Sequence, residues 1–159
     1  QESWAMIPSS HAIAFSLNGE PVEARIEAHV LLIDLLRNSF ALNGVKRSCD
    51  MEVCGACTVL VDEQPVSSCN MLAVDVDGTA VLTIEGIGDP ENLDPIQNAF
   101  IEHGAVQCGF CTPGFILTIK ALLQVNPKPS REEMVRQLNG NICRCTGYKK
   151  IIEAVESLV

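Results

Sequence analysis

Aromatic residues and positive charges are both scarce in this sequence. Aromatic residues make up only 4% of the 159 residues, and 11 Lys and Arg stand against 20 Asp and Glu, for a formal net charge of -9. Few aromatic rings leave little surface for stacking on single-stranded bases, and an acidic surface is repelled by a phosphate backbone. We therefore expect no nucleic-acid partner.

A long apolar run and an export signal are absent as well. No segment reaches the roughly 20 apolar residues that a membrane-spanning helix needs. The N-terminal stretch QESWAMIPSSHAIAF holds no basic segment and no twin arginine. These absences predict a cytoplasmic protein with no membrane span. GxGxxG, P-loop and Ser-His-Asp motifs are also missing, which predicts that the chain has no substrate site of its own.

Cysteine is the residue in which the chain is rich. Four disulfides would suit a secreted chain, but clustered cysteines in a reducing compartment more often bind metal. Both sets of cysteines are therefore candidate metal ligands. The eight fall into a first set, Cys49, Cys54, Cys57 and Cys69, and a second set, Cys108, Cys111, Cys143 and Cys145.

The first half of the chain is expected to consist of strands and loops around one helix. Asn18-Gly19 is a typical hairpin turn. Apolar residues at helical spacing predict a helix from Leu31 to Phe40, which Asn43-Gly44 would end. A helix among strands predicts a compact α+β domain over 12–85, after an N-terminal arm over 1–11. The expected strands are 12–17, 22–26, 58–61, 65–68 and 80–84.

The second half, over 93–159, is expected to be helical after a linker over 86–92 that contains Gly and Pro. Asp94 and Ser130 each begin a capping box, which marks the start of a helix. Short connections favour an antiparallel four-helix bundle. The four expected helices cover 95–103, 112–124, 131–139 and 148–159.

The first set of cysteines has the spacing of a plant-type [2Fe–2S] site. Four and then two residues separate Cys49, Cys54 and Cys57, and Cys69 follows after eleven more. A diiron cluster takes two thiolates on each iron, and a wrapping loop can present three of them from one short segment. Gly55 would let backbone N–H groups approach the cluster. The spacing favours iron–sulfur over zinc, and disulfides least.

The second set is split into two close pairs, with 31 residues between Cys111 and Cys143. Each pair stands near the start of an expected helix, and a helix N-terminus favours anions such as thiolates. Two helix ends that faced each other would bring the four thiolates together. Spacing alone leaves a four-cysteine zinc site open here.

Three segments give the chain a resemblance to a known family: CDMEVCGACTVLVDEQPVSSC, AVQCGFCTPGFI and NGNICRCTGYKKI. Over about residues 12–159 the chain resembles the small iron–sulfur subunit of molybdenum hydroxylases, the xanthine oxidase family. The resemblance implies a β-grasp, plant-type ferredoxin-like domain followed by a four-helix bundle. Each would hold one [2Fe–2S] cluster, the second cluster on the second set of cysteines. Ser48 and Glu63 stand where the family usually has Gly.

The resemblance also implies roles for two residues and for partner subunits. The family's glutamine at the position of Gln107 hydrogen-bonds the pterin of the molybdenum cofactor, and the cysteine that matches Cys145 lies next to the pterin amino group. A large subunit would hold the molybdopterin, in its dinucleotide form, together with the substrate. Electrons would pass through the second and then the first cluster to an FAD-binding subunit or, in some members, a cytochrome. Taken alone, Gln107 would be a capping or surface amide.

Two other functions stay open at this point. One is a free two-cluster ferredoxin that serves several partners, and the other is a structural zinc protein. A red-brown colour would separate iron from zinc, and co-purification with a large subunit would separate a subunit from a free carrier.

Overall fold

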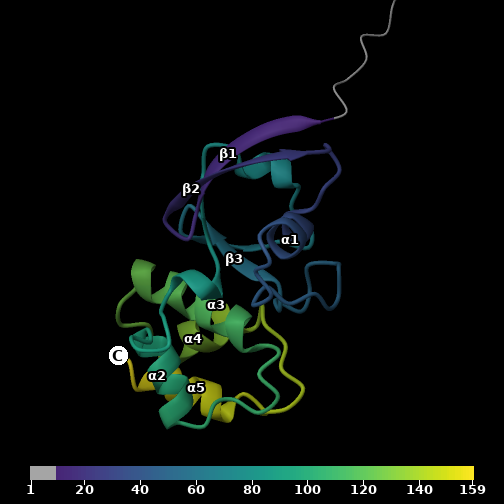
Figure 1. Cartoon of the computed structure of the whole chain (residues 1–159). Coiled ribbons are helices and arrows are strands. Elements are labelled where there is room, and N and C mark those ends of the chain that lie inside the picture. Colours follow the sequence, from purple (N-terminus) through teal and green to yellow (C-terminus); the bar gives the residue numbers. More distant parts are fainter. Residues whose placement is uncertain (1–9) are drawn as a thin grey trace, which may run out of the picture.

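The computed structural model describes residues 10–159, so nearly all of the predicted arm over 1–11 lies outside the described residues. A five-stranded mixed sheet occupies the first half of the chain, and helices dominate the second half (Figure 1). The predicted α+β class is confirmed. The strands are β1 (His11–Leu17), β2 (Glu20–Ile26), β3 (Thr58–Val61), β4 (Gln64–Ser67) and β5 (Ala80–Leu82). The helices are α1 (Leu32–Asp34), α2 (Pro95–Glu102), α3 (Thr112–Val125), α4 (Arg131–Leu138) and α5 (Lys149–Glu156).

The sheet has the strand order β2-β1-β5-β3-β4, in which β1 and β5 are parallel and the other neighbours antiparallel. Successive side chains of a strand point to opposite faces, so β1 buries Ile13, Phe15 and Leu17 in one core with α1. All five predicted strands are present. Ile84 lies beyond β5, in a short 3-10 turn (Ile84–Gly86) rather than in the strand.

The helix predicted from Leu31 to Phe40 is present, as α1 and a π-helical turn (Leu35–Ser39) that continues it. The predicted stop at Asn43-Gly44 is wrong, because the helix has already ended at Ser39, and Ala41 leaves it with a φ of +56°. Gly44 meets a different requirement, because a Cβ on it would lie 2.2 Å from Ile84 Cγ2. That glycine marks a close approach of two chain segments instead of a helix stop.

Both predicted capping boxes are formed. Asp94 Oδ1 accepts a hydrogen bond from Ile96 N at 2.9 Å, and Gln97 Oε1 accepts one from Asp94 N at 2.9 Å. Ser130 and Glu133 exchange the same two bonds at the start of α4. All four helices predicted for the second half are present, and none of the helices within residues 10–159 is long and apolar enough to cross a membrane.

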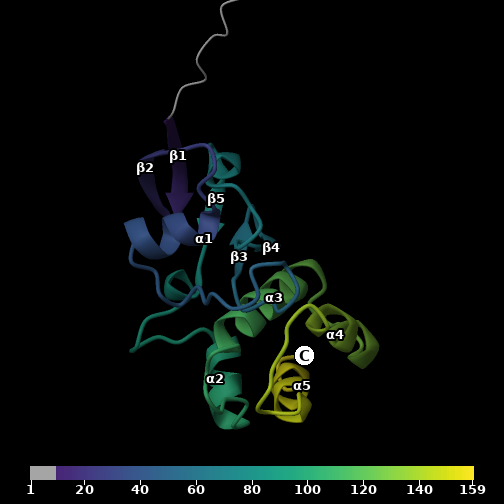
Figure 2. The same cartoon turned by 90° about the vertical axis from the view of Figure 1, so that its right-hand side faces the viewer.

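Helix α3 connects the helical half to the sheet. It lies beneath β3 in both views (Figure 1 and Figure 2), and its Leu117 and Ala121 pack in a small core with Leu60 of β3. Two larger cores flank this contact, one between the sheet and α1 and one among the helices α2 to α5. Through α3, the packing fixes how the two cysteine-bearing regions sit relative to each other.

Candidate metal centres

The first set of cysteines gathers between the loop that precedes β3 and the end of the β3–β4 hairpin. Cys49, Cys54 and Cys57 lie in the loop, and the antiparallel pairing of β3 with β4 returns the chain so that Cys69 joins them. Ser68 Oγ donates to the Cys57 carbonyl at 2.7 Å and holds the two segments together. Cys57 and Cys69 are buried, and the other two are half-buried. The structure therefore brings these four together, and their binding of metal stays a prediction.

Backbone N–H groups of the loop surround Cys49. Val53 N and Cys54 N donate to Cys49 Sγ at 3.5 and 3.4 Å. The N–H of Met51, followed by those of Cys54 and Val53, lowers the pKa of the Cys49 thiol to about 6. Because the thiolate and not the thiol is the metal ligand, the loop favours the form of Cys49 that can bind metal.

Two residues of this loop adopt the left-handed backbone conformation without being glycine: Asp50 has a φ of +53° and Glu52 a φ of +60°. This conformation turns successive N–H groups toward one side and forms a concave site for anions. Burial raises the pKa of the Cys69 thiol to about 11, and the N–H of Glu52 opposes this rise. Cys69 would therefore release a proton when it binds metal.

The second set lies between the start of α3 and the loop before α5. Cys111 directly precedes α3, whereas Cys143 and Cys145 lie in a loop that ends only at Lys149, the first residue of α5. Cys143 Sγ accepts hydrogen bonds from Cys145 N at 3.4 Å and from Thr146 N and Oγ1 at 3.4 and 3.1 Å. A turn, not a second helix end, thus supplies the donors at Cys143.

Protonation differs among the thiols of the second set. Burial raises the pKa of Cys111 to about 12. Burial also acts to raise the pKa of Cys143, but the hydroxyl and N–H of Thr146, the N–H of Cys145 and the Cys111 thiol together outweigh it, and the pKa is lowered. Thr146 therefore favours the thiolate form of Cys143, a role that was not predicted from the sequence.

Neighbouring thiols act on one another within both sets. Cys145 Sγ lies 3.6 Å from Cys108 Sγ, far beyond the roughly 2.05 Å of a disulfide. Two thiolates bound at about 2.3 Å to one tetrahedral metal lie about 3.8 Å apart. No three potential ligands in the described part of the chain are close enough to hold a single metal ion. Thiols that act in twos fit a diiron cluster, with two on each iron. The thiol of Cys54 lowers the pKa of Cys49, whereas that of Cys57 raises the pKa of Cys69 and that of Cys143 raises the pKa of Cys111.

The two sites touch through their backbones. Ile142 N donates to the Cys54 carbonyl at 2.9 Å, and Asn141 Nδ2 donates to the Gly55 carbonyl at 3.0 Å. Gly55 has a φ of +67°, and a Cβ on it would lie 2.3 Å from the Gly140 carbonyl oxygen. Gly55 is thus required at the contact between the two halves, in addition to the predicted approach to a cluster. Neither this contact nor the buried Asn141 was predicted.

An exposed face surrounds the second set. Cys108, Cys145 and Gln107 are exposed, and the large side chains of Phe110 and Ile142 are 44% and 48% exposed beside them. Gln107 does not cap α3, because the residue at that position is Cys111 and it has no side-chain cap. Gln107 is therefore a surface amide and not a helix cap, and its contact with a pterin stays a prediction.

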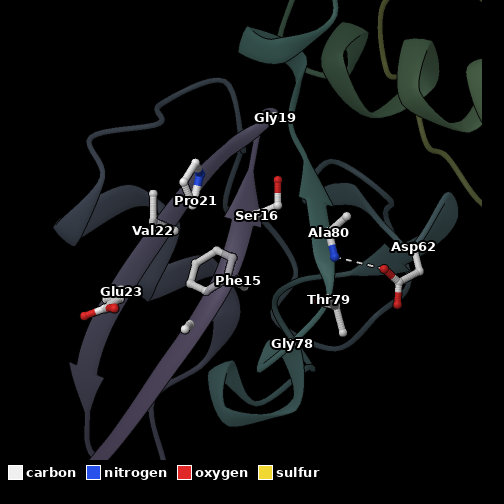
Figure 3. Close-up of a pocket in the computed structure, with 11 residues that line it drawn as sticks. Phe15, Ser16, Gly19, Pro21, Val22, Glu23, Asp62, Gly78, Thr79 and Ala80 are labelled. Atoms are coloured by element: carbon white, nitrogen blue, oxygen red, sulfur yellow. Dashed lines mark hydrogen bonds between the residues drawn. The ribbon is translucent and has the colours of Figure 1, made fainter.

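An open hollow lies elsewhere, on the outer face of the sheet (Figure 3). Glu23, Asp62 and Thr79 are among the residues that line it, and none of the eight cysteines does. Asp62 Oδ1 accepts a hydrogen bond from Ala80 N at 2.8 Å, which stabilises the sheet at the wall of this hollow. The hollow is thus separate from both sets of cysteines.

Comparisons with known proteins identify an iron–sulfur domain in each half of the chain. A family model described as "2Fe-2S iron-sulfur cluster binding domain" matches residues 15–82, and one described as "[2Fe-2S] binding domain" matches residues 83–156. The chain is 48% identical to the nicotinate dehydrogenase small FeS subunit of Eubacterium barkeri, over 92% of this chain and 94% of that one. It is 46% identical to the nicotine 6-hydroxylase small subunit of Paenarthrobacter nicotinovorans, over 90% and 86%.

Solved structures show the same likeness. Quinoline 2-oxidoreductase from Pseudomonas putida 86 superposes with a TM-score of 0.89 at 42% identity, over 92% of this chain and 91% of that one. Aldehyde oxidoreductase from Desulfovibrio gigas also gives a TM-score of 0.89, at 44% identity, over 91% of this chain but only 16% of that one. In the second case the matched region is a small part of a much longer chain.

Proposed function

Because this chain belongs to the family of small iron–sulfur subunits of molybdenum hydroxylases, we propose that its eight cysteines relay electrons from a molybdopterin site toward a flavin subunit. The chain is an electron-transfer subunit with two [2Fe–2S] clusters, each of which takes up and releases one electron at a time. The observation that carries the proposal is the presence of two sets of four thiols whose loops are in hydrogen-bond contact. A free ferredoxin is not favoured, since the relatives are subunits of larger enzymes.

We assign the ligands by set. The first cluster would be held by Cys49, Cys54, Cys57 and Cys69, and the second by Cys108, Cys111, Cys143 and Cys145. The loop N–H groups at Cys49 and the Thr146 hydroxyl at Cys143 would stabilise bound thiolates. We also propose a β-grasp, ferredoxin-like domain over 12–85, a linker over 86–92 and a four-helix domain over 93–159.

The partners follow from the relatives. The chain is the small subunit of a multi-subunit molybdenum hydroxylase, whose large subunit would carry the molybdopterin, in its dinucleotide form, and the substrate. We propose an FAD-binding subunit, or a cytochrome, as the acceptor. The relatives include subunits of nicotinate dehydrogenase, caffeine dehydrogenase and aldehyde oxidoreductase, and we propose that the large subunit decides the substrate. A cytoplasmic location stays a prediction.

Metal analysis tests the assignment of two clusters. Purified protein should contain about four iron and four acid-labile sulfide per chain, because each [2Fe–2S] cluster contributes two of each. Iron and sulfide assays, together with the visible absorption of the protein, measure this directly. Stoichiometric zinc without sulfide would contradict both sites.

Replacing Gln107 tests the direction of electron flow. We propose that Gln107 and Cys145 contact the pterin, so the second cluster would lie nearer to molybdenum. Gln107→Ala should leave both clusters assembled but slow reduction of the second cluster by substrate in the complex. Electron paramagnetic resonance of the complex should show Mo(V) coupled more strongly to the second cluster than to the first.

The matched control is Gln124→Ala, which removes an exposed glutamine from α3 far along the chain from the cysteines. This variant should transfer electrons at the normal rate. Equal slowing in both variants, or stronger coupling of Mo(V) to the first cluster, would refute the role of Gln107.

A further inference from the structure

Glu52 occupies a backbone conformation that its residue type rarely adopts. Its φ of +60° lies in the left-handed region that favours glycine. Strained residues of this kind persist where surrounding contacts over-determine them, and they cluster at functional sites. The contacts of Glu52 should therefore show which function this backbone conformation serves.

One side-chain hydrogen bond attaches Glu52 to the segment that supplies the fourth thiol. Its carboxylate Oε2 accepts from Asn70 Nδ2 at 2.8 Å, and Asn70 directly follows Cys69. The backbone N–H of Glu52 acts on the same segment, because it lowers the pKa of the Cys69 thiol against the larger effect of burial. Because Cys69 comes from beyond the hairpin, Glu52 links the cysteine loop to that segment and holds a carboxylate at the edge of the first site.

The neighbouring carboxylates of Asp34 and Asp50 form ion pairs with Arg47, whereas the carboxylate of Glu52 forms no ion pair among the described residues. Arg47 Nε lies 3.0 Å from Asp50 Oδ1, and the same guanidinium pairs with Asp34. Among the ion pairs within residues 10–159, none includes the exposed carboxylate of Glu52. Glu52 thus adds an uncompensated negative charge beside Cys69.

We propose that Glu52 is a positioning residue whose tethered carboxylate lowers the reduction potential of the first cluster. The proposal rests on the proposed ligand set of that cluster. An electron taken up at this site adds one negative charge among four thiolates, and a fixed carboxylate nearby opposes it. Net charge and hydrogen bonds to sulfur are among the factors that set cluster potentials. A lower potential makes the reduced first site a better one-electron donor to the acceptor subunit.

Glu52→Gln removes the negative charge but keeps the hydrogen bond, because a glutamine oxygen can still accept from Asn70 Nδ2. Paramagnetic resonance is followed during a redox titration of the cluster-loaded protein. We expect the reduced-to-oxidised ratio of the first cluster at a fixed potential to rise about threefold, which corresponds to about 28 mV for a one-electron couple. The second cluster serves as the internal reference and should not shift. The effect should shrink at high salt, since ions screen an exposed charge.

Glu63→Gln is the matched control. Glu63 is also exposed and left-handed, with a φ of +66°, but it lies in the turn between β3 and β4, at the end of the hairpin away from Cys57 and Cys69. This variant makes the same change in net charge and should leave the first cluster's potential unchanged. Glu52→Asp keeps the charge and should stay near the wild-type potential.

The titrations distinguish a failure of the proposed role of Glu52 from a failure of the proposed ligand set of the first cluster. An equal shift in Glu63→Gln, an equal shift in Glu52→Asp, or no shift in Glu52→Gln with both clusters present would overturn the role of Glu52 alone. Wild-type protein that lacks a first-cluster signal would instead refute the proposed ligand set.

Discussion

Cys54→Ser is expected to remove the first cluster and leave the second in place. Serine keeps the backbone carbonyl that accepts the bond from Ile142, so the contact between the two halves survives. The loss of one of four thiolates should nevertheless lower the iron content from about four to about two per chain. Iron and sulfide assays and the loss of one of two paramagnetic signals measure this change.

The same substitution should destabilise the N-terminal half. Metal binding contributes directly to folding free energy, and a region of about 70 residues has a small core of its own. Val53→Ser is the matched control, because Val53 adjoins Cys54, is 54% exposed and contacts Cys49 through its backbone N–H. That variant should keep both clusters. A full complement of iron in Cys54→Ser would show that Cys54 is not a ligand.

Gly55→Ala is expected to weaken the junction between the two halves. The new Cβ would lie 2.3 Å from the Gly140 carbonyl oxygen and 2.5 Å from Asn141 Nδ2, and the φ of +67° adds strain. Overpacking of this kind and the left-handed conformation together cost about 3 kcal/mol. The melting temperature of the cluster-loaded protein should therefore fall by about 6–12 °C.

Gly78→Ala isolates the backbone-strain part of this effect. Gly78 has a similar φ of +74°, but nothing lies within 4 Å of a Cβ placed on it. Its replacement should cost only the left-handed strain, about 1–2 kcal/mol. Equal losses in the two variants would mean that the clash of the new Cβ with Gly140 and Asn141 adds nothing to the loss of stability.

Local features of the sequence were sufficient to predict the secondary structure and the number of sites. Capping boxes at Asp94 and Ser130 mark helix starts because their hydrogen bonds span only three residues. Alternation along β1 and the turn at Asn18-Gly19 are equally local. The cysteine spacing indicated two metal-binding regions, which agrees with the two matched [2Fe–2S] family models. The stop of the first helix was misassigned to Asn43-Gly44 because the helix ends in a π-helical turn, which leaves no recognisable pattern in the sequence.

Tertiary structure alone decided how the sites are built and joined. The bond between Asn141 and Gly55 connects residues 86 positions apart, and no local pattern specifies such a pairing. The bond from Asn70 to Glu52 exists only because the β3–β4 hairpin returns the chain to the cysteine loop. The sequence alone specifies which thiols are available and in what groups. The packing of α3 against β3, together with the bonds from Asn141 and Ile142 to the first cysteine loop, joins the two regions, because neighbours across two separate cores depend on the whole fold.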